Sequence, residues 1–286
     1  MRFSRSSAWR LAFTLLLLFV VPVGVALSRH LSDDARPGDW RSARHDSSGQ
    51  APDPQQTPAA VIQVYAARAF GWRGVFGVHT WIATKNSDAE RYTRLEVVGW
   101  GVQRGIDAVR IHHGEADGYW YGNAPTVIRE VRGGAEVDAL IDRLHSAARA
   151  YPYNHEYRLW PGPNSNTFIA YLGRAVPELH LDLPPTAIGK DYLPAGGLVA
   201  SAPSGGGFQF SLVGLLGVMI AAEEGVEVNL LGLSLGIDLS PPALKLPGIG
   251  RLGMASNDQA LAPATADNGR DPAAIEGRRE EPPERP

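Results

Sequence analysis

A serine and a histidine in two separate segments could act as a nucleophile and its base. Ser165 lies in the run Asn-Ser-Asn-Thr-Phe, directly after Pro-Gly-Pro, and His79 lies in an alternating segment, 78–83. A hydroxyl at a helix N-terminus is close to unpaired N–H groups and to the positive end of the helix dipole, which stabilise developing negative charge. A serine still needs a base within hydrogen-bond reach, and His79 is the candidate. Glu96, on the next expected strand, is the candidate for orienting His79.

The same residues also have a simpler structural interpretation. Asn164, Ser165 and Asn166 are all good N-cap residues and could do no more than start a helix. Asn164 and Asn166 are in addition candidate binding residues. Lys190 and Asp191 are two further binding candidates, because they are expected in a loop after a Pro-Pro turn. The alternative for this second pair is two solvated loop residues.

Other kinds of site find less support in the sequence. The run 232–236 fits G-x-S-x-G but lies inside an alternating strand, and 248–253 fits G-x-G-x-x-G without a following helix. The chain has no cysteine, which excludes disulfides and thiolate catalysis, and it has no H-E-x-x-H pair. We therefore expect no metal site and no cofactor. A net charge of -3, without long basic runs, also argues against nucleic acid as a partner.

The elements that must position these residues are strands first and helices afterwards. Alternating apolar residues predict five strands, at 61–65, 78–83, 92–100, 109–112 and 127–131. Helical spacing predicts one helix at 137–148 and a second that begins at Ser165 or Asn166 and ends before Pro177. The fold class is therefore α+β, with an antiparallel sheet packed with two main helices.

A Gly-rich apolar β-hairpin follows, formed by strands at 208–222 and 226–239. Both strands are apolar on both faces and are interrupted mainly by glycine. Such strands are either buried on both sides or in contact with lipid, and we expect them to be buried.

The ends of the chain differ in composition from its middle. Arg2, Arg5 and Arg10 precede an uncharged apolar run at 11–27, which predicts a signal or transmembrane anchor over 1–28. A disordered spacer is expected over 29–58, a single α+β domain over 59–253 and a disordered tail over 254–286. The arginines place the folded domain outside the cytoplasm at a bacterial inner membrane. The alternative is a secreted or periplasmic form cleaved near Ser28.

Two resemblances add to this interpretation. The motifs W-P-G-P-N-S-N-T-F at 160–168 and L-P-P-T-A-I-G-K-D-Y at 183–192 resemble a bacterial envelope family of unknown function, over nearly all of 59–253. More remotely, the chain is similar to circularly permuted papain-like enzymes. These carry a histidine on an early strand and later a cysteine at a helix start, in an Asn-Cys-x-x-Phe pattern. Ser165 stands at the position of that cysteine, so the resemblance implies either a serine-type hydrolase or transferase, or a relative that has lost catalysis.

The expected function is a non-catalytic, membrane-anchored binding module of the cell envelope on a papain-like scaffold. Its ligand would be an envelope glycan, lipid or protein. Membrane lipid would be contacted through the N-terminal anchor and through the strands at 208–239. The alternative is a Ser/His-dependent acyl- or amide-bond hydrolase or acyltransferase.

Overall fold

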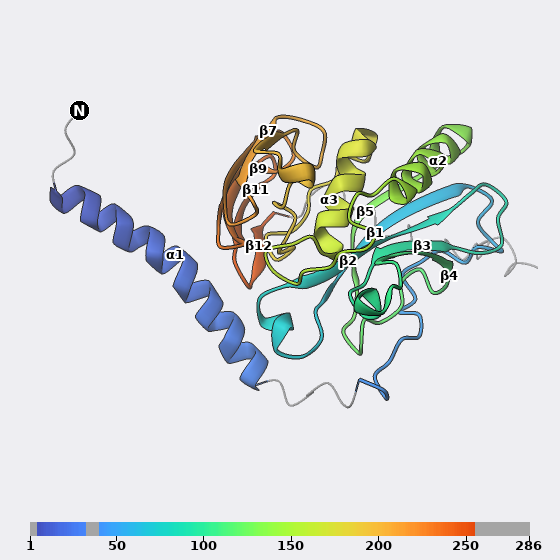
Figure 1. Ribbon diagram of the computed structural model, residues 1–286, viewed down its shortest axis with the longest axis horizontal. Coiled ribbons are helices and arrows are strands. Elements are labelled where there is room, and N and C mark those ends of the chain that lie inside the picture. Colours follow the sequence, from blue (N-terminus) through green and yellow to red (C-terminus); the bar gives the residue numbers. More distant parts are fainter. Residues whose placement is uncertain (1–4, 33–39, 255–286) are drawn as a thin grey trace, which may run out of the picture.

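Residues 5–32 and 40–254 are described by the computed structural model, and they form three α-helices and two antiparallel sheets (Figure 1). The first sheet has five strands in the order β4-β3-β2-β1-β5, and the second has seven in the order β12-β11-β10-β9-β8-β7-β6. The mixed α+β class expected from the sequence is therefore found.

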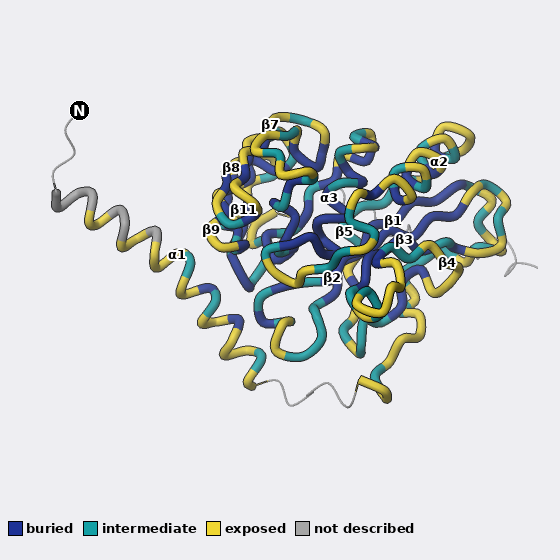
Figure 2. The backbone as a smooth tube through the Cα atoms, viewed as in Figure 1, coloured by how far each residue is buried: buried dark blue, intermediate teal, exposed yellow. Residues whose placement is uncertain are grey.

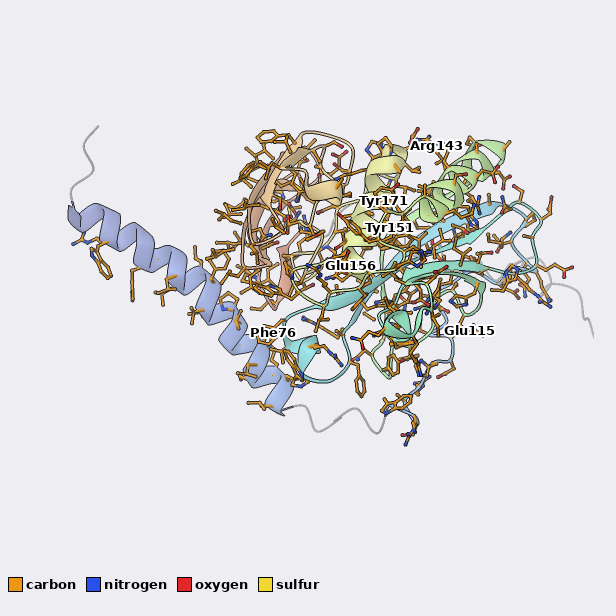
Figure 3. All side chains as sticks on the ribbon, in the orientation of Figure 1. Phe76, Glu115, Arg143, Tyr151, Glu156 and Tyr171 are labelled. Atoms are coloured by element: carbon orange, nitrogen blue, oxygen red, sulfur yellow. The ribbon has the colours of Figure 1, made fainter. Side chains whose placement is uncertain are left out.

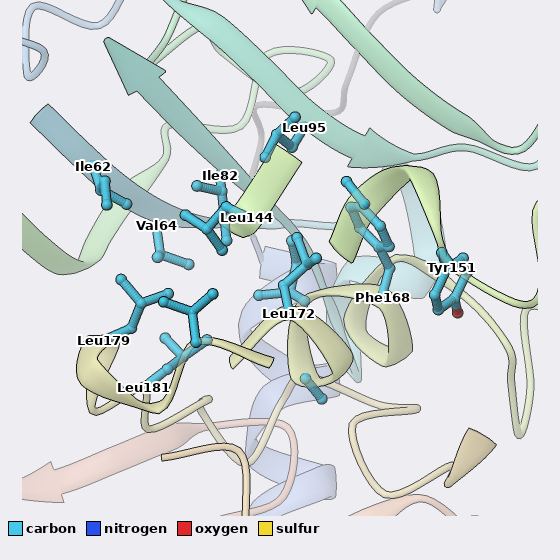
Figure 4. Packing of buried hydrophobic residues seen from close by; sticks show 14 of the residues in the cluster. Ile62, Val64, Ile82, Leu95, Leu144, Tyr151, Phe168, Leu172, Leu179 and Leu181 are labelled. Atoms are coloured by element: carbon cyan, nitrogen blue, oxygen red, sulfur yellow. The ribbon is translucent and has the colours of Figure 1, made fainter. Parts of the chain in front are cut away.

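The first sheet contains the five strands that the sequence predicts. Their bounds are β1 Ala60–Arg68, β2 Val78–Lys85, β3 Thr93–Val97, β4 Val109–His113 and β5 Thr126–Gly133. Helices α2, Ala135–Arg149, and α3, Ser165–Ala175, pack on one face of this sheet. The core between them is apolar and fully buried, and it includes Ile62, Val64, Ile82, Leu95, Leu144, Phe168 and Leu172 (Figure 4). Burial of one such side chain contributes roughly 2 kcal/mol, so this layer holds the helices on the sheet.

The opposite face of the first sheet carries a second cluster. Side chains alternate along a strand, so Ile82 of β2 faces the helices while His79 and Trp81 point away from them. Trp81 is fully buried there against Tyr65 of the neighbouring strand. A mainly aliphatic layer and an aromatic-rich layer therefore use the two faces of one sheet.

The second sheet is built from short hairpins. Its strands are β6 Val199–Ala200, β7 Phe208–Leu212, β8 Leu216–Ala221, β9 Gly225–Leu230, β10 Leu233–Leu239, β11 Pro242–Leu246 and β12 Gly250–Gly253. The prediction of two long strands at 208–222 and 226–239 is wrong, because each range folds back on itself. Val213 and Gly214 have φ values of 53° and 73°, and Leu231 and Gly232 have values of 54° and 82°. Two successive residues with positive φ make the tight turn that suits a twisted hairpin.

The second sheet reverses the usual arrangement of apolar and polar side chains on the two faces of a sheet. Exposed and buried residues alternate along β7 to β11, with apolar side chains outward and polar ones inward. In one row across the inner face, Gln209, Met219, Glu227, Gly236 and Lys245 stand in register. The expectation of burial on both faces therefore holds for the inner face alone.

Helix α1 spans Arg5–Ser32 and contacts the short 3-10 helix Gly71–Val75 and strands β10 and β11. Its side chains are mostly exposed (Figure 2). The sequence predicted a membrane helix in this region. Within 5–32 and 40–254, no helix combines the length and the apolar character needed to cross a membrane.

The segment expected to be a disordered spacer, 29–58, makes specific contacts in its second half. Asp117 accepts hydrogen bonds from the Ser47 hydroxyl at 2.7 Å and from the Gln50 and Ala51 backbone N–H groups at 2.5 and 3.1 Å. The Ser48 hydroxyl donates to the Asp117 backbone carbonyl at 2.8 Å. A buried carboxylate that gathers several donors offsets the entropy of ordering this polar chain. Positions 33–39 of the spacer, and all but the first residue of the 254–286 tail, lie outside the described residues.

Candidate functional site

An open cavity of about 260 Å³ lies on the face of the first sheet opposite α2 and α3. It is lined by aromatic and ionisable side chains, namely His45, Arg94, Glu96, Trp100, His112, Glu115, Tyr119, Trp120 and Tyr121. Figure 3 shows Glu115 below the first sheet, whereas Arg143 of α2 and Tyr171 of α3 lie above it. We call this hollow the aromatic cavity.

Glu96 of β3 is the centre of the polar part of the cavity. One carboxylate oxygen accepts from His79 Nε2 at 3.1 Å and from the Arg94 guanidinium at 2.9 Å. The other oxygen lies 3.1 Å from His112 Nε2. Strand pairing explains the grouping, because Arg94 and His112 are direct cross-strand partners and Trp81 faces Glu96 from β2. Glu96, expected from the sequence to orient His79, does make this contact.

The ionisation of these groups follows from their neighbours. Burial raises the pKa of Glu96, but the hydrogen bonds from His112 and His79 and the charge of Arg94 outweigh it and hold the pKa well below its usual range. Burial lowers the pKa of His79, more than Glu96 raises it, so this ring is neutral at pH 7. The hydrogen bond to Glu96 raises the pKa of His112. The cavity floor is therefore a fixed carboxylate surrounded by donors.

Nearly parallel rings connect the core to the cavity surface. Tyr65 stacks on Trp81 at a centroid distance of 5.3 Å, and Trp81 on His79 at 5.7 Å. His79 in turn stacks on Trp120 at 3.6 Å, and Trp120 on Trp100 at 5.9 Å. These five rings form what we call the aromatic ladder. Each stacked pair contributes about 0.5–1.5 kcal/mol beyond its buried area, so the last ring, Trp100, is held firmly although it is 55% exposed.

Arg94 adds an unsatisfied donor to the cavity. Its guanidinium carbon lies 4.1 Å from the centre of the Trp81 ring, and the side chain is buried. The Arg94 Nε–H is buried and makes no hydrogen bond with any residue in the described part of the chain. Buried donors are rarely left without a partner, so this group is an exception within the described residues.

The structure does not connect Ser165 to His79. Ser165 is buried at the first turn of α3, and no hydrogen bond joins its hydroxyl to His79 within the described residues. Its neighbour Asn166 accepts a hydrogen bond from Thr80 at 2.8 Å on the helix side of β2. His79 points to the other side of that strand, toward Trp120.

Asn164 and Asn166 hold the helix start against the second motif. Asn164 is the N-cap of α3 and accepts from the Asn166 and Thr167 backbone N–H groups at 3.0 and 3.2 Å. The amides of both asparagines donate to the Ile188 carbonyl, at 3.0 and 2.8 Å. Gly189 fits beside them, because a Cβ there would lie 2.3 Å from the Asn164 amide nitrogen. The two sequence motifs therefore form one structural unit.

Lys190 and Asp191 join that unit to the second sheet. Lys190 is fully buried and donates to Glu227 at 2.5 Å and to the Leu183 carbonyl at 3.0 Å. Asp191 accepts from the Gln209 amide at 2.5 Å. The solvated loop pair considered as an alternative is wrong for both residues, and their partners are internal.

Sequence reasoning named Glu96 as a site candidate but did not assign the tryptophans of this cavity to a site. Trp100 was expected at the end of a strand at 92–100, whereas β3 ends at Val97 and Trp100 follows in an irregular segment, as Trp120 does after β4. The available signal was the number of tryptophans. The chain has seven, which is more than packing in the core would be expected to use. Within the described residues, no group of three histidine, aspartate or glutamate side chains could hold a metal ion.

Comparison with known proteins gives a family without an activity. Residues 59–192 match the model of a family described as a protein of unknown function, DUF3750. This range contains the first sheet, α2, α3 and both sequence motifs, and it ends before the second sheet. No curated protein and no solved structure matches the chain. The matched region therefore resembles an unknown-function domain, and its chemistry must be argued from the site.

Proposed function

We propose that this chain is a non-catalytic binding module, attached to a membrane of the bacterial envelope, that holds a neutral saccharide in the aromatic cavity. The observation that carries the proposal is the position of Trp100. Its indole is exposed, held by the aromatic ladder, and adjacent to the polar floor around Glu96.

A sugar ring suits both parts of this cavity. One face of a pyranose presents C–H groups that pack on a flat indole, and its rim carries hydroxyls that accept and donate hydrogen bonds. Arg94 lines the cavity, and its Nε–H has no hydrogen-bond partner among the described residues. The charge of Glu96 is balanced by Arg94, and His112 engages its second oxygen, so the floor gives little net attraction to a charged ligand.

The ionisation state argues for binding rather than catalysis. Both oxygens of Glu96 are engaged and its pKa is depressed, so it has no proton to donate near neutral pH. The alternative of a Ser/His-dependent hydrolase or acyltransferase needs a base next to Ser165, whereas His79 points to the face of the first sheet away from α3, toward Trp120. Serine in place of the papain-like cysteine fits a scaffold that has lost catalysis.

Membrane attachment is supported by the character of α1. Leu16, Leu17 and Leu18 are consecutive and all exposed, so they point in three directions around the helix. Water is a poor environment for a helix that is apolar all round. Arg10, near its N-terminal end, suits the phosphates of a membrane surface.

Isothermal titration calorimetry of the full chain in lipid nanodiscs tests the saccharide site. The probes are cellotetraose, maltotetraose and tetra-N-acetylchitotetraose, all of which are neutral. We expect at least one to bind, and Trp100→Ala to weaken that binding by about tenfold or more, since one lost stacking contact of about 1.4 kcal/mol has this effect.

Trp72→Ala is the matched control, because Trp72 is 66% exposed and does not line the cavity. It should bind as the unmodified chain does. Absence of heat with every probe at millimolar concentration, or equal loss in the two variants, would contradict the proposal.

A further inference from the structure

The outer face of the second sheet is apolar at every outward position of its six long strands. The outward side chains form rows in register across the sheet. One row is Phe208, Ile220, Val226, Ile237, Leu244 and Leu252. A second row is Leu212, Leu216, Leu230 and Leu233. Most of these side chains are two-fifths or more exposed. Five gaps of ~4.8 Å between six strands make this face roughly 24 Å wide.

This orientation is fixed by charges on the inner face. Lys245 is fully buried and lies 2.8 Å from Glu227, 2.8 Å from Asp182 and 3.0 Å from Asp238. Glu227 also binds Lys190, which belongs to the unit around α3. Turning the sheet over would place the apolar rows against Lys190 and Asp182 and break their pairs with Glu227 and Lys245, at a cost of several kcal/mol. The apolar face therefore points outward as a property of the fold, and large patches of this kind mark interaction sites.

The patch continues onto α1. The helix contacts β10 and β11, and Gly248, between β11 and β12, lies so close to it that a Cβ there would be 3.1 Å from Ala26. Along the same helix, apolar side chains are exposed in several directions, as the consecutive Leu16, Leu17 and Leu18 show. A second copy of the sheet would cover one side of such a helix and leave the others in water. Lipid acyl chains can cover the exposed apolar side chains of such a helix and a flat apolar sheet beside it.

We infer that the outer face of β7 to β12 lies against the acyl chains of a lipid bilayer, next to α1. The inference rests on the membrane attachment proposed above and is independent of the saccharide site. The outward rows of this surface carry no hydrogen-bonding side chain. A protein partner with a polar rim would engage such side chains, whereas hydrocarbon does not require them. The sheet would thus fix the orientation of the whole domain on the membrane.

The experiment uses the absence of native cysteine. Val228→Cys places one thiol in the middle of the outer face, at a position that is 41% exposed. Asp142→Cys places the matched thiol on the exposed side of α2, far from α1 and the second sheet (Figure 1). Each full-length variant is labelled with an environment-sensitive fluorophore and added to vesicles of phosphatidylcholine with phosphatidylglycerol. Quenching is measured with doxyl-labelled acyl chains and with aqueous iodide.

We expect the label at 228 to be quenched several-fold more by doxyl chains than the label at 142, and several-fold less by iodide. Equal iodide quenching at both positions, with the protein still on the vesicles, would overturn the inference and leave attachment by α1 intact. Protection at 228 from both quenchers would also overturn it, because a second protein chain would then cover the face. Failure to bind the vesicles would remove membrane attachment and this inference together.

Discussion

Replacing Gly189 by alanine should separate the two sequence motifs that start α3. Gly189 has a φ of 99°, and a Cβ built there would lie 2.3 Å from the nitrogen and 2.5 Å from the oxygen of the Asn164 side-chain amide. The amide must move, because the backbone on the other side is fixed by the Thr167 hydroxyl, which donates to the Gly189 carbonyl at 2.8 Å. The substitution therefore acts on the cap of α3 through Asn164.

The magnitude follows from the contacts that are lost. A left-handed backbone costs alanine about 1–2 kcal/mol. Loss of the Asn164 cap costs ~1 kcal/mol. The carbonyls of Leu159 and Ile188 each lose one donor, which adds roughly 1 kcal/mol in total because Ile188 keeps its bond from Asn166. We expect unfolding free energy to fall by about 3–4 kcal/mol, measured by urea denaturation followed by tryptophan fluorescence.

Two controls isolate the contact from the backbone conformation. Gly196 also has positive φ, 68°, but has no atom within 4 Å of a built Cβ, so Gly196→Ala should cost only about 1 kcal/mol. In an Asn164→Ala background, Gly189→Ala should lose most of its cost, because the side chain it displaces is absent. An equal cost of Gly189→Ala with and without Asn164 would refute the reasoning.

Three further predictions concern other parts of the molecule. Lys245→Met should lower the free energy of unfolding by about 3–5 kcal/mol, since it removes the buried cation shared by Glu227, Asp182 and Asp238. Lys85→Met, which loses one bond to a backbone carbonyl, should cost much less in the same urea assay. The hydrogen bond to Glu96 raises the pKa of His112 in the folded state. This bond therefore stabilises the fold fully at pH values below the ordinary histidine pKa of about 6.5. The stabilisation is lost as the pH rises through the pKa of His112 in the folded state. The free energy of unfolding of the unmodified chain, compared with that of His112→Gln, should fall from acid to alkaline pH. Because His112 is half-exposed, this fall should be no more than about 0.5 kcal/mol. A stability difference that grows with pH would contradict the prediction. Asp117→Ala should release the segment that precedes β1, which limited proteolysis would detect as new cleavage there while the rest of the chain stays resistant.

Regular elements of the first sheet were predictable because local periodicity specifies them. The stripe from Val137 to Ala148 predicted a helix at 137–148, and α2 spans Ala135–Arg149. Alternation at 78–83 predicted the strand that became β2, and the neighbouring strand brought Glu96 to His79. These contacts follow from strand pairing, which the sequence pattern can indicate.

The second sheet was harder to predict because its interior is charged. Gln209, Glu227 and Lys245 occupy inward positions, yet the usual assumption assigns polar residues to solvent and apolar ones to the core. Their partners, such as Lys190, are distant in the sequence, so no local pattern shows that these ions are buried in pairs. The aromatic cavity was missed for a similar reason, since Trp100 is brought to it by an irregular segment.

The register of the second sheet also decides which changes in length this sheet can accept. Gln209, Glu227 and Lys245 are evenly spaced in the sequence and occupy the same inner row of alternate strands. A whole hairpin could be inserted or removed without disturbing the alternation of its neighbours, as in stacked repeats. Insertion of a single residue within a strand would instead turn the side chains beyond it to the opposite face, with leucines against the buried ions and a carboxylate outward. Related chains should therefore differ here by whole hairpins.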